Sequence, residues 1–103
     1  MANPETELQR DITDTLTVRG CLVYRLNSGG YRSRVQLCPP GTPDLLVVAP
    51  DGSVIWMEVK LTSGQVSDTQ HEHHAKLRAH GQAVAVVRSV AQALDALDRL
   101  TGV

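Results

Sequence analysis

The stretch PDLLVVAPDGSVIWMEVK, residues 43–60, places charged residues at the ends of two apolar runs. The run LLVVA is short and apolar, as expected of a buried strand, and SVIWMEVKL follows it as a return strand after the turn PDG. Asp44 precedes the first run, whereas Glu58 and Lys60 end the second. Buried strands seldom carry charge, so these three residues mark either a functional site or a salt bridge at the edge of a strand.

The length of the hairpin loop decides whether Asp44 meets Glu58. Successive strand residues point to opposite faces of a sheet. A three-residue loop at 50–52 sets Asp44 opposite Glu58, with Gly52 in the left-handed position that such loops require. A two-residue loop at 51–52 would instead set Asp44 opposite Val59, on the other face. The sequence leaves both registers open.

Caps and periodicity predict the remaining elements. We expect a helix from Asn3-Pro4 to Gly20, a strand over 21–27, a loop over 28–43, strands over 45–49 and 53–61, a helix from Ser67 to Gly81, a strand over 83–88 and a helix after Ser89. In the last helix the apolar face is expected to consist of Val90, Leu94, Leu97 and Leu100. The order α-β-β-β-α-β-α predicts an α/β fold in which helices flank a central mixed β-sheet.

The composition favours one small domain over residues 1–103, because 42% of the 103 residues are hydrophobic. No apolar run approaches the roughly 20 residues of a membrane span, and the N-terminus does not resemble a signal peptide. Two cysteines do not form a disulfide framework, so we expect a cytoplasmic protein. The net charge of −1 argues neither for nor against nucleic acid, although residues 19–42 contain four arginines and no acid.

Asp44 and Glu58 would repel each other in the first register unless a cation lay between them. A site with few oxygen ligands suits Mg²⁺, which keeps most of its waters. Lys60 beside such a site could orient a water or stabilise charge developing on phosphorus. Together these groups suit metal-assisted phosphodiester hydrolysis. The alternative is a salt bridge between Lys60 and either acid.

The pattern PD, thirteen intervening residues, then EVK resembles the PD-(D/E)XK nuclease superfamily. The segments ETEL, VYRLNSGG, GTPDLLV, MEVK, SGQVSDTQ and LRAHGQAVAVV, spread over roughly residues 5–90, resemble one branch of it, the VRR-NUC (virus-type replication-repair nuclease) domain. The resemblance implies an αβββαβ(α) nuclease core, an Mg²⁺ or Mn²⁺ cofactor and a DNA substrate.

The resemblance also assigns roles at the motif. It implies that Asp44, Glu58 and the carbonyl of Val59 bind the metal, and that Lys60 is catalytic. It further implies a catalytic acid within ETEL, residues 5–8.

Helical geometry distinguishes the two acids of that segment. Glu5 shares a stripe with Leu8, Ile12 and Leu16, whereas Glu7 lies about 200° away. We therefore predict Glu5 as the helix acid.

Gln70 matches a glutamine that lies at the active site in this family, and so becomes a candidate catalytic residue. It also fits a capping box with Ser67, and the sequence leaves both interpretations open. In the segment HEHHAK, His71 and His74 could share a metal, but a solvated helix face is favoured because no third ligand is evident.

The arginine-bearing segment before Asp44 is the predicted DNA contact. Arginines suit phosphate, and Ser28 with the glycines after it would let the backbone approach a strand closely. The predicted DNA-binding residues are Arg25, Ser28, Arg32 and Arg34.

The predicted function is metal-dependent, structure-selective cleavage of DNA by an endonuclease. A chain of 103 residues leaves no room for a separate recognition domain. Stand-alone members of the family look like junction or flap nucleases of phages and bacteria, which implies a homodimer that resolves Holliday junctions in DNA repair. The last helix and the arginine loop are the candidate dimer interfaces. The alternatives are a flap or branched-DNA nuclease and an inactive DNA-binding module. We expect neither a membrane partner nor a nucleotide cofactor.

Overall fold

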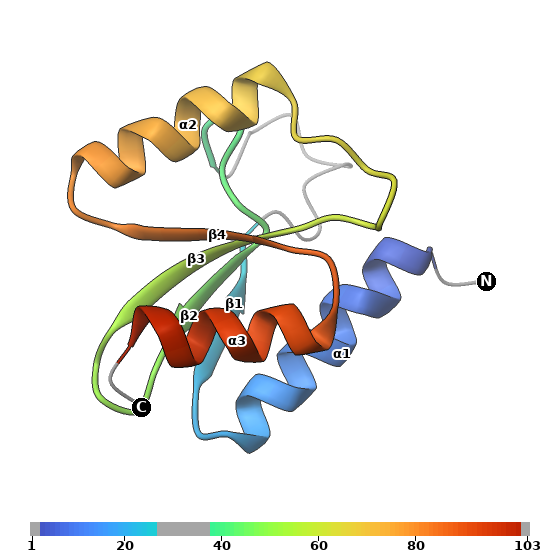
Figure 1. Cartoon of the computed structure of the whole chain (residues 1–103), viewed down its shortest axis with the longest axis vertical. Helices are drawn as coiled ribbons and strands as arrows, with labels where there is room; N and C mark the ends of the chain where they lie inside the picture. The colour runs from blue at the N-terminus through green and yellow to red at the C-terminus, as the bar shows by residue number, and fades with distance from the viewer. Residues whose placement is uncertain (1–2, 27–37, 102–103) are drawn as a thin grey trace.

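The computed structural model describes residues 3–26 and 38–101, and its elements follow the predicted order (Figure 1). The elements are α1 (Pro4–Val18), β1 (Leu22–Arg25), β2 (Leu45–Val48), β3 (Val54–Val59), α2 (Asp68–Ala79), β4 (Ala83–Val87) and α3 (Val90–Leu100). The strands are shorter at their ends than the sequence suggested. The expected loop over 28–43 is described only from residue 38 onward.

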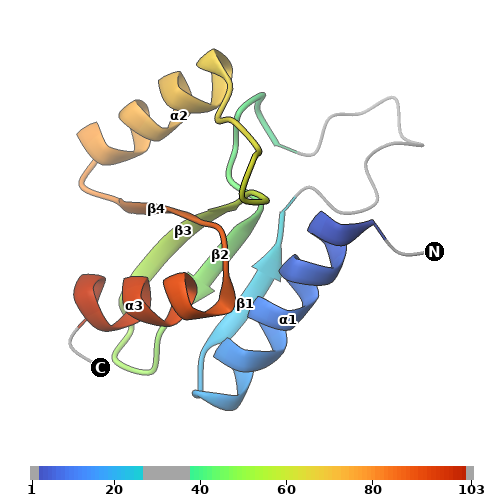
Figure 2. The same cartoon turned by 45° about the vertical axis from the view of Figure 1, so that its right-hand side comes forward.

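The four strands form one mixed sheet in the order β1-β2-β3-β4. β1 pairs with β2 and β2 with β3 in antiparallel fashion, whereas β4 runs parallel to β3 after the crossover through α2. Figure 2 shows α1 and α3 on one face of the sheet and α2 on the other. The predicted α/β fold, with a mixed sheet flanked by helices, is therefore confirmed.

Helix α1 begins and faces the sheet as the sequence predicts. Asn3 Oδ1 accepts a hydrogen bond from the Glu5 N–H at 2.8 Å, and Pro4 occupies the first turn. Ile12 and Leu16 are fully buried in the core between α1 and the sheet. Burial of each such side chain contributes about 1.5–3 kcal/mol, so this stripe fixes the rotation of α1 about its axis.

The hairpin adopts the register that joins the two motif acids. The Ala49 N–H donates to the Ser53 carbonyl at 2.8 Å, and the Gly52 N–H donates to the Ala49 carbonyl at 2.9 Å. Gly52 has a φ of +88°, the left-handed conformation expected at this position. Leu45 stands opposite Met57, so Asp44 stands opposite Glu58. The three-residue loop is confirmed.

The buried face of α3 differs from the expected one. Ala93, Ala96 and Leu97 are buried, whereas Leu100 is 37% exposed. Val90 and Leu94 are partly buried against the same core. Two small residues therefore share the buried face of α3 with Leu97. The predicted face was wrong at Leu100 and incomplete at the alanines.

Within the described part of the chain, no helix combines the length and the apolar character needed to cross a membrane.

Candidate active site

Asp44 is held from both sides at the start of β2. Its backbone carbonyl accepts a hydrogen bond from the Leu26 N–H at 2.9 Å. Its side-chain Oδ2 accepts one from the Val59 N–H at 2.8 Å. These contacts tie Asp44 to the continuation of β1 and to the end of β3. The carboxylate therefore has a fixed position at the end of the hairpin.

Glu58 is a buried carboxyl beside this fixed one. Its exposed fraction is 1%. The pKa of Glu58 is raised to about 9, chiefly by burial and further by a hydrogen bond to Asp44 and by the charge of Asp44. Lys60 opposes the shift, whereas the charge of Glu5 adds to it. In the absence of a cation Glu58 is therefore protonated at neutral pH.

Four of the predicted catalytic residues come together at this corner of the sheet. Asp44, Lys60 and Glu5 all act electrostatically on Glu58, although Asp44 directly precedes β2, Lys60 directly follows β3 and Glu5 lies at the start of α1. Glu5 is half-buried, whereas Glu7 is exposed. The choice of Glu5 over Glu7 from helical geometry thus agrees with where the two side chains lie.

Val59 ends β3 and lies just beyond the last pair of the β2–β3 ladder. The last pair of β2 and β3 is Leu45 opposite Met57, and the same register, continued by two residues, sets Pro43 opposite Val59. Proline has no N–H, so it cannot donate to the Val59 carbonyl. The N–H and C=O of one strand residue point to the same side. The Val59 carbonyl therefore points toward the side on which Asp44 accepts the Val59 N–H.

Gln70 forms the capping box of α2. Its side-chain Oε1 accepts a hydrogen bond from the Ser67 N–H at 2.9 Å, and its own N–H donates to Ser67 Oγ at 3.1 Å. The capping role is confirmed. The catalytic role of Gln70 stays a prediction.

His74 corrects the expectation of a solvated histidine face on α2. His71 is exposed as expected, but His74 is only 2% exposed, and its Nε2 lies 3.3 Å from Glu58 Oε1. Burial lowers the pKa of His74, as do the nearby positive charges, so the contact with protonated Glu58 is a hydrogen bond between neutral groups rather than an ion pair. The i, i+4, i+7 spacing of Gln70, His74 and Leu77 is the signal that could have identified this inward face.

Two loops next to the site are fixed by backbone contacts. Arg88 Nη1 donates to the carbonyls of Leu61 and Gly64 at 2.7 and 2.6 Å and so holds the turn that follows Lys60. Gly41, at φ +84°, lies against the carbonyl of Thr69, where any Cβ would collide. Only glycine therefore lets the loop before Asp44 rest on α2.

Of the predicted DNA-binding residues, only Arg25 lies within the described part of the chain. Its side chain is exposed and donates to Gln9 Oε1 at 3.1 Å. It is the last residue of β1, and the Leu26 N–H that follows donates to the carbonyl of Asp44. The other three, Ser28, Arg32 and Arg34, lie outside the described residues.

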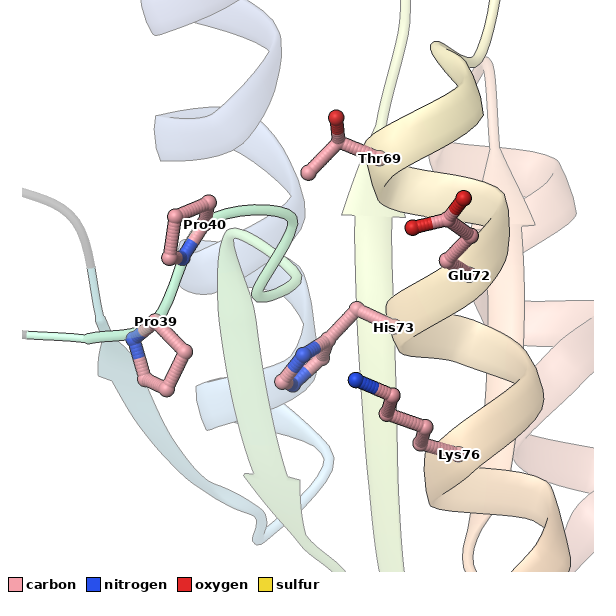
Figure 3. Close-up of a pocket in the computed structure, with 6 residues that line it drawn as sticks. All are labelled: Pro39, Pro40, Thr69, Glu72, His73 and Lys76. Carbon is pink, nitrogen blue, oxygen red and sulfur yellow. The ribbon is translucent and has the colours of Figure 1, made fainter.

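A pocket separates the loop around residues 39–40 from one flank of α2 (Figure 3). Figure 3 shows His73 and Lys76 pointing from α2 toward the two prolines of the loop. Its lining residues are Pro39, Pro40, Thr69, Glu72, His73 and Lys76. None of them is a predicted site residue, so this pocket is separate from the carboxylate pair.

The donor set suits a divalent cation that keeps part of its water. Among residues 3–26 and 38–101, no three His, Cys, Asp or Glu side chains gather closely enough to hold a metal by themselves. The protein instead offers two adjacent carboxyls, Asp44 and Glu58, and the carbonyl of Val59. A cation between the carboxyls would relieve the repulsion that keeps Glu58 protonated. Few protein ligands with retained waters are what Mg²⁺ prefers.

Comparison with known proteins assigns the family. The sequence model of the VRR-NUC domain matches residues 3–91. The protein "Putative nuclease p44" of Acyrthosiphon pisum secondary endosymbiont phage 1 is 29% identical over 85 residues, which cover 82% of this chain and 83% of the phage protein. A solved structure described as "VRR_NUC domain" superposes with a TM-score of 0.75 at 29% identity, over 97% of this chain and 100% of that one.

A second solved structure shares the fold at greater distance. It is described as "VRR_NUC domain protein" and has a TM-score of 0.72 at 14% identity, over 99% of this chain and 91% of that one. The chain belongs to the VRR-NUC family, and it is therefore a nuclease domain. The resemblance inferred from the motif is confirmed.

Proposed function

We propose that this VRR-NUC domain is a metal-dependent endonuclease that hydrolyses phosphodiester bonds in branched DNA. The observation that supports this most is the hairpin register, which sets Asp44 opposite Glu58. Lys60 lies close enough to act electrostatically on Glu58 and is partly exposed to solvent. A domain without chemistry has no reason to bury one carboxyl against another. That argument favours an enzyme over an inactive DNA-binding module.

Asp44, Glu58 and the carbonyl of Val59 are the proposed ligands of Mg²⁺ or Mn²⁺. When bound, the cation supplies Lewis acidity toward a phosphate oxygen and lowers the pKa of water. Asp44 offers its second carboxylate oxygen, because Oδ2 is engaged by the Val59 N–H. Pro43 leaves the Val59 carbonyl without a ladder donor from β2.

The other site residues are proposed to act on the water and the phosphate. Lys60 carries a positive charge at the edge of the pair, where it can orient a water and stabilise charge developing on phosphorus. Glu5 approaches the same corner from α1 and is proposed to accept a hydrogen bond from the attacking water. Gln70 is proposed to contribute its side-chain amide N–H, since its Oε1 is already used by the cap.

The DNA is proposed to lie along the segment that leads into Asp44. Arg25, Ser28, Arg32 and Arg34 would contact its phosphates, and such contacts supply much of the affinity of DNA-binding proteins. Because phosphate contacts carry no sequence information, selection by DNA structure is expected.

The proposed substrate is a four-way junction, and the proposed working form is a symmetric homodimer in DNA repair. One chain carries one carboxylate pair, whereas resolution of a junction needs two opposed nicks. A twofold dimer supplies two sites related by the symmetry that the junction approximates. The apolar face of α3 is not available as the interface, because Ala93, Ala96 and Leu97 are buried in their own chain.

A cleavage panel tests the proposal. Four-way junctions, flaps and linear duplexes are incubated with the purified protein in Mg²⁺, Mn²⁺ or EDTA, and light scattering gives the mass in solution. We expect paired symmetric nicks in the junction, metal dependence, and twice the 11.2 kDa chain mass.

Each alternative predicts a different result in that panel. A monomer that cuts only flaps would favour the flap-nuclease alternative. Tight binding of junctions without any cleavage in either metal would favour the inactive module.

A further inference from the structure

His74 is a buried polar side chain on a helix that otherwise shows little apolar character. It is 2% exposed and lies on α2, whose sequence DTQHEHHAKLRA contains a single large aliphatic residue, Leu77. An isolated polar group costs free energy when it is buried, unless it finds a hydrogen-bond partner. The partner of His74 is Glu58, whose Oε1 lies 3.3 Å from Nε2.

The two side chains meet from elements that the fold holds in place. Glu58 belongs to β3, between β2 and β4, and α2 connects β3 to β4. The capping box of Ser67 and Gln70 fixes the start of α2, and Gly41 lets the loop before Asp44 rest against it. The position of His74 relative to Glu58 is thus set by the crossover itself.

When Glu58 binds a cation, its ionised state determines which of the two side chains donates the hydrogen bond. An ionised carboxylate only accepts hydrogen bonds, so the imidazole must donate its Nε2–H to Oε1. That bond restrains rotation of the carboxylate and leaves Oε2 as the oxygen available to a metal. Protein groups that hold a metal ligand in this manner commonly set its orientation and basicity.

We propose that His74 is a positioning residue of the metal site, which orients Glu58 through the Nε2–Oε1 hydrogen bond; this inference rests on the metal-dependent function proposed above. His74 does not itself contact the metal or the DNA in this account. An apolar side chain of similar volume could fill its space beside the sheet. Such a replacement would leave Glu58 Oε1 without its donor, so the affinity of the site for the metal would fall.

Three substitutions separate this role from simple packing. Gln in place of His74 can present an amide N–H near the position of Nε2, whereas Leu fills the space without a donor. Asn is too short to reach Glu58 and serves if the Leu variant does not fold. His71→Leu is the matched control, because His71 is exposed on the same helix. Mn²⁺ affinity is measured by calorimetry without DNA, and the Mn²⁺ dependence of junction cleavage is measured separately.

We expect His74→Leu to weaken Mn²⁺ binding by about 10–100-fold, as loss of such outer partners usually does. The Mn²⁺ concentration for half-maximal cleavage should rise by the same factor. His74→Gln and His71→Leu should stay close to the wild type. The melting temperature of His74→Leu in EDTA should fall, because the buried Glu58 Oε1 loses its partner, whereas His74→Gln should keep it.

Two results would overturn the inference while leaving the nuclease function intact. One is a His74→Leu protein that binds Mn²⁺ and cuts DNA with the metal dependence of the wild type. The other is that the Gln and Leu variants lose Mn²⁺ affinity equally and that both also melt at a lower temperature than the wild type. That result would show that His74 serves only in packing. A wild-type protein that neither binds Mn²⁺ nor cuts DNA would instead refute the proposed function, and this inference with it.

Discussion

The Val59 N–H donates a hydrogen bond to Asp44 Oδ2 at 2.8 Å, so a side chain takes the place of a backbone acceptor at the end of the β2–β3 ladder. The register of the ladder, continued past its last pair, sets Pro43 opposite Val59, and proline has no N–H. The dipeptide Pro43-Asp44 thus ends backbone pairing and fixes a carboxylate in the same place. This substitution of side chain for backbone creates the corner at which Glu58, Lys60 and Asp44 meet.

The burial of Glu58 predicts a specific pH dependence of stability in EDTA. The pKa of Glu58 is about 9 in the folded protein and near the ordinary glutamate value of 4.5 in the unfolded chain. Between these values the folded state binds more protons, so the free energy of unfolding falls as pH rises. The contribution of Glu58 is fully present below pH 4.5 and is lost progressively as the pH approaches 9.

Glu58→Gln should remove that slope, because glutamine cannot ionise. In EDTA the variant should be more stable than the wild type at pH 8, and the gap should narrow at pH 5. Thermal melts at both pH values measure this difference. Added Mn²⁺ should raise the melting temperature of the wild type but not that of Glu58→Gln. A gap between the two proteins that did not change with pH would show that Glu58 is ionised in the folded protein.

Glu5→Gln should reduce single-turnover cleavage by about 100-fold or more, because the attacking water loses the acceptor proposed for it and such groups typically contribute that much. Glu7→Gln should leave it near the wild-type rate. Glu5 is half-buried and acts on Glu58, whereas Glu7 is exposed on the same turn of α1 and serves as the matched control. The opposite ranking of the two variants would place the helix acid at Glu7.

The two roles of Gln70 can be separated by Gln70→Glu. Glutamate supports a capping box as well as glutamine does, so the melting temperature should be retained. The side-chain N–H is lost, however, and a carboxylate replaces it, so junction cleavage should fall. Gln70→Ala should lower both, with about 1 kcal/mol lost from the cap. Full activity in Gln70→Glu would show that Gln70 serves only as a cap.

The helix ends and the hairpin could be predicted because local chemistry determines them. Asn3 and Ser67 each satisfy backbone N–H groups that follow them within three residues, whatever the rest of the chain does. The register of the hairpin depends on one loop, and Gly52 adopts the positive φ that the longer loop requires. From that register the opposition of Asp44 and Glu58 follows directly.

His74 and the alanines of α3 could not be found in the same way. Periodicity methods look for large apolar residues, and α2 buries a histidine instead, because its partner on the sheet is a carboxyl. Ala93 and Ala96 are buried in α3, although each contributes little apolar area of its own. Both features depend on which element lies opposite, and a single sequence does not state this.

The most direct test of the central claim is junction cleavage by Asp44→Asn beside the wild type, in Mn²⁺ and in EDTA. The Asn side-chain oxygen can still accept from the Val59 N–H, so the corner should keep its shape while losing the charge that holds the cation. We predict a cleavage rate lower by a factor of at least about 100, more than the loss of an outer partner costs, together with unchanged junction binding. Cleavage by Asp44→Asn at the wild-type rate, or undiminished wild-type cleavage in EDTA, would contradict the account.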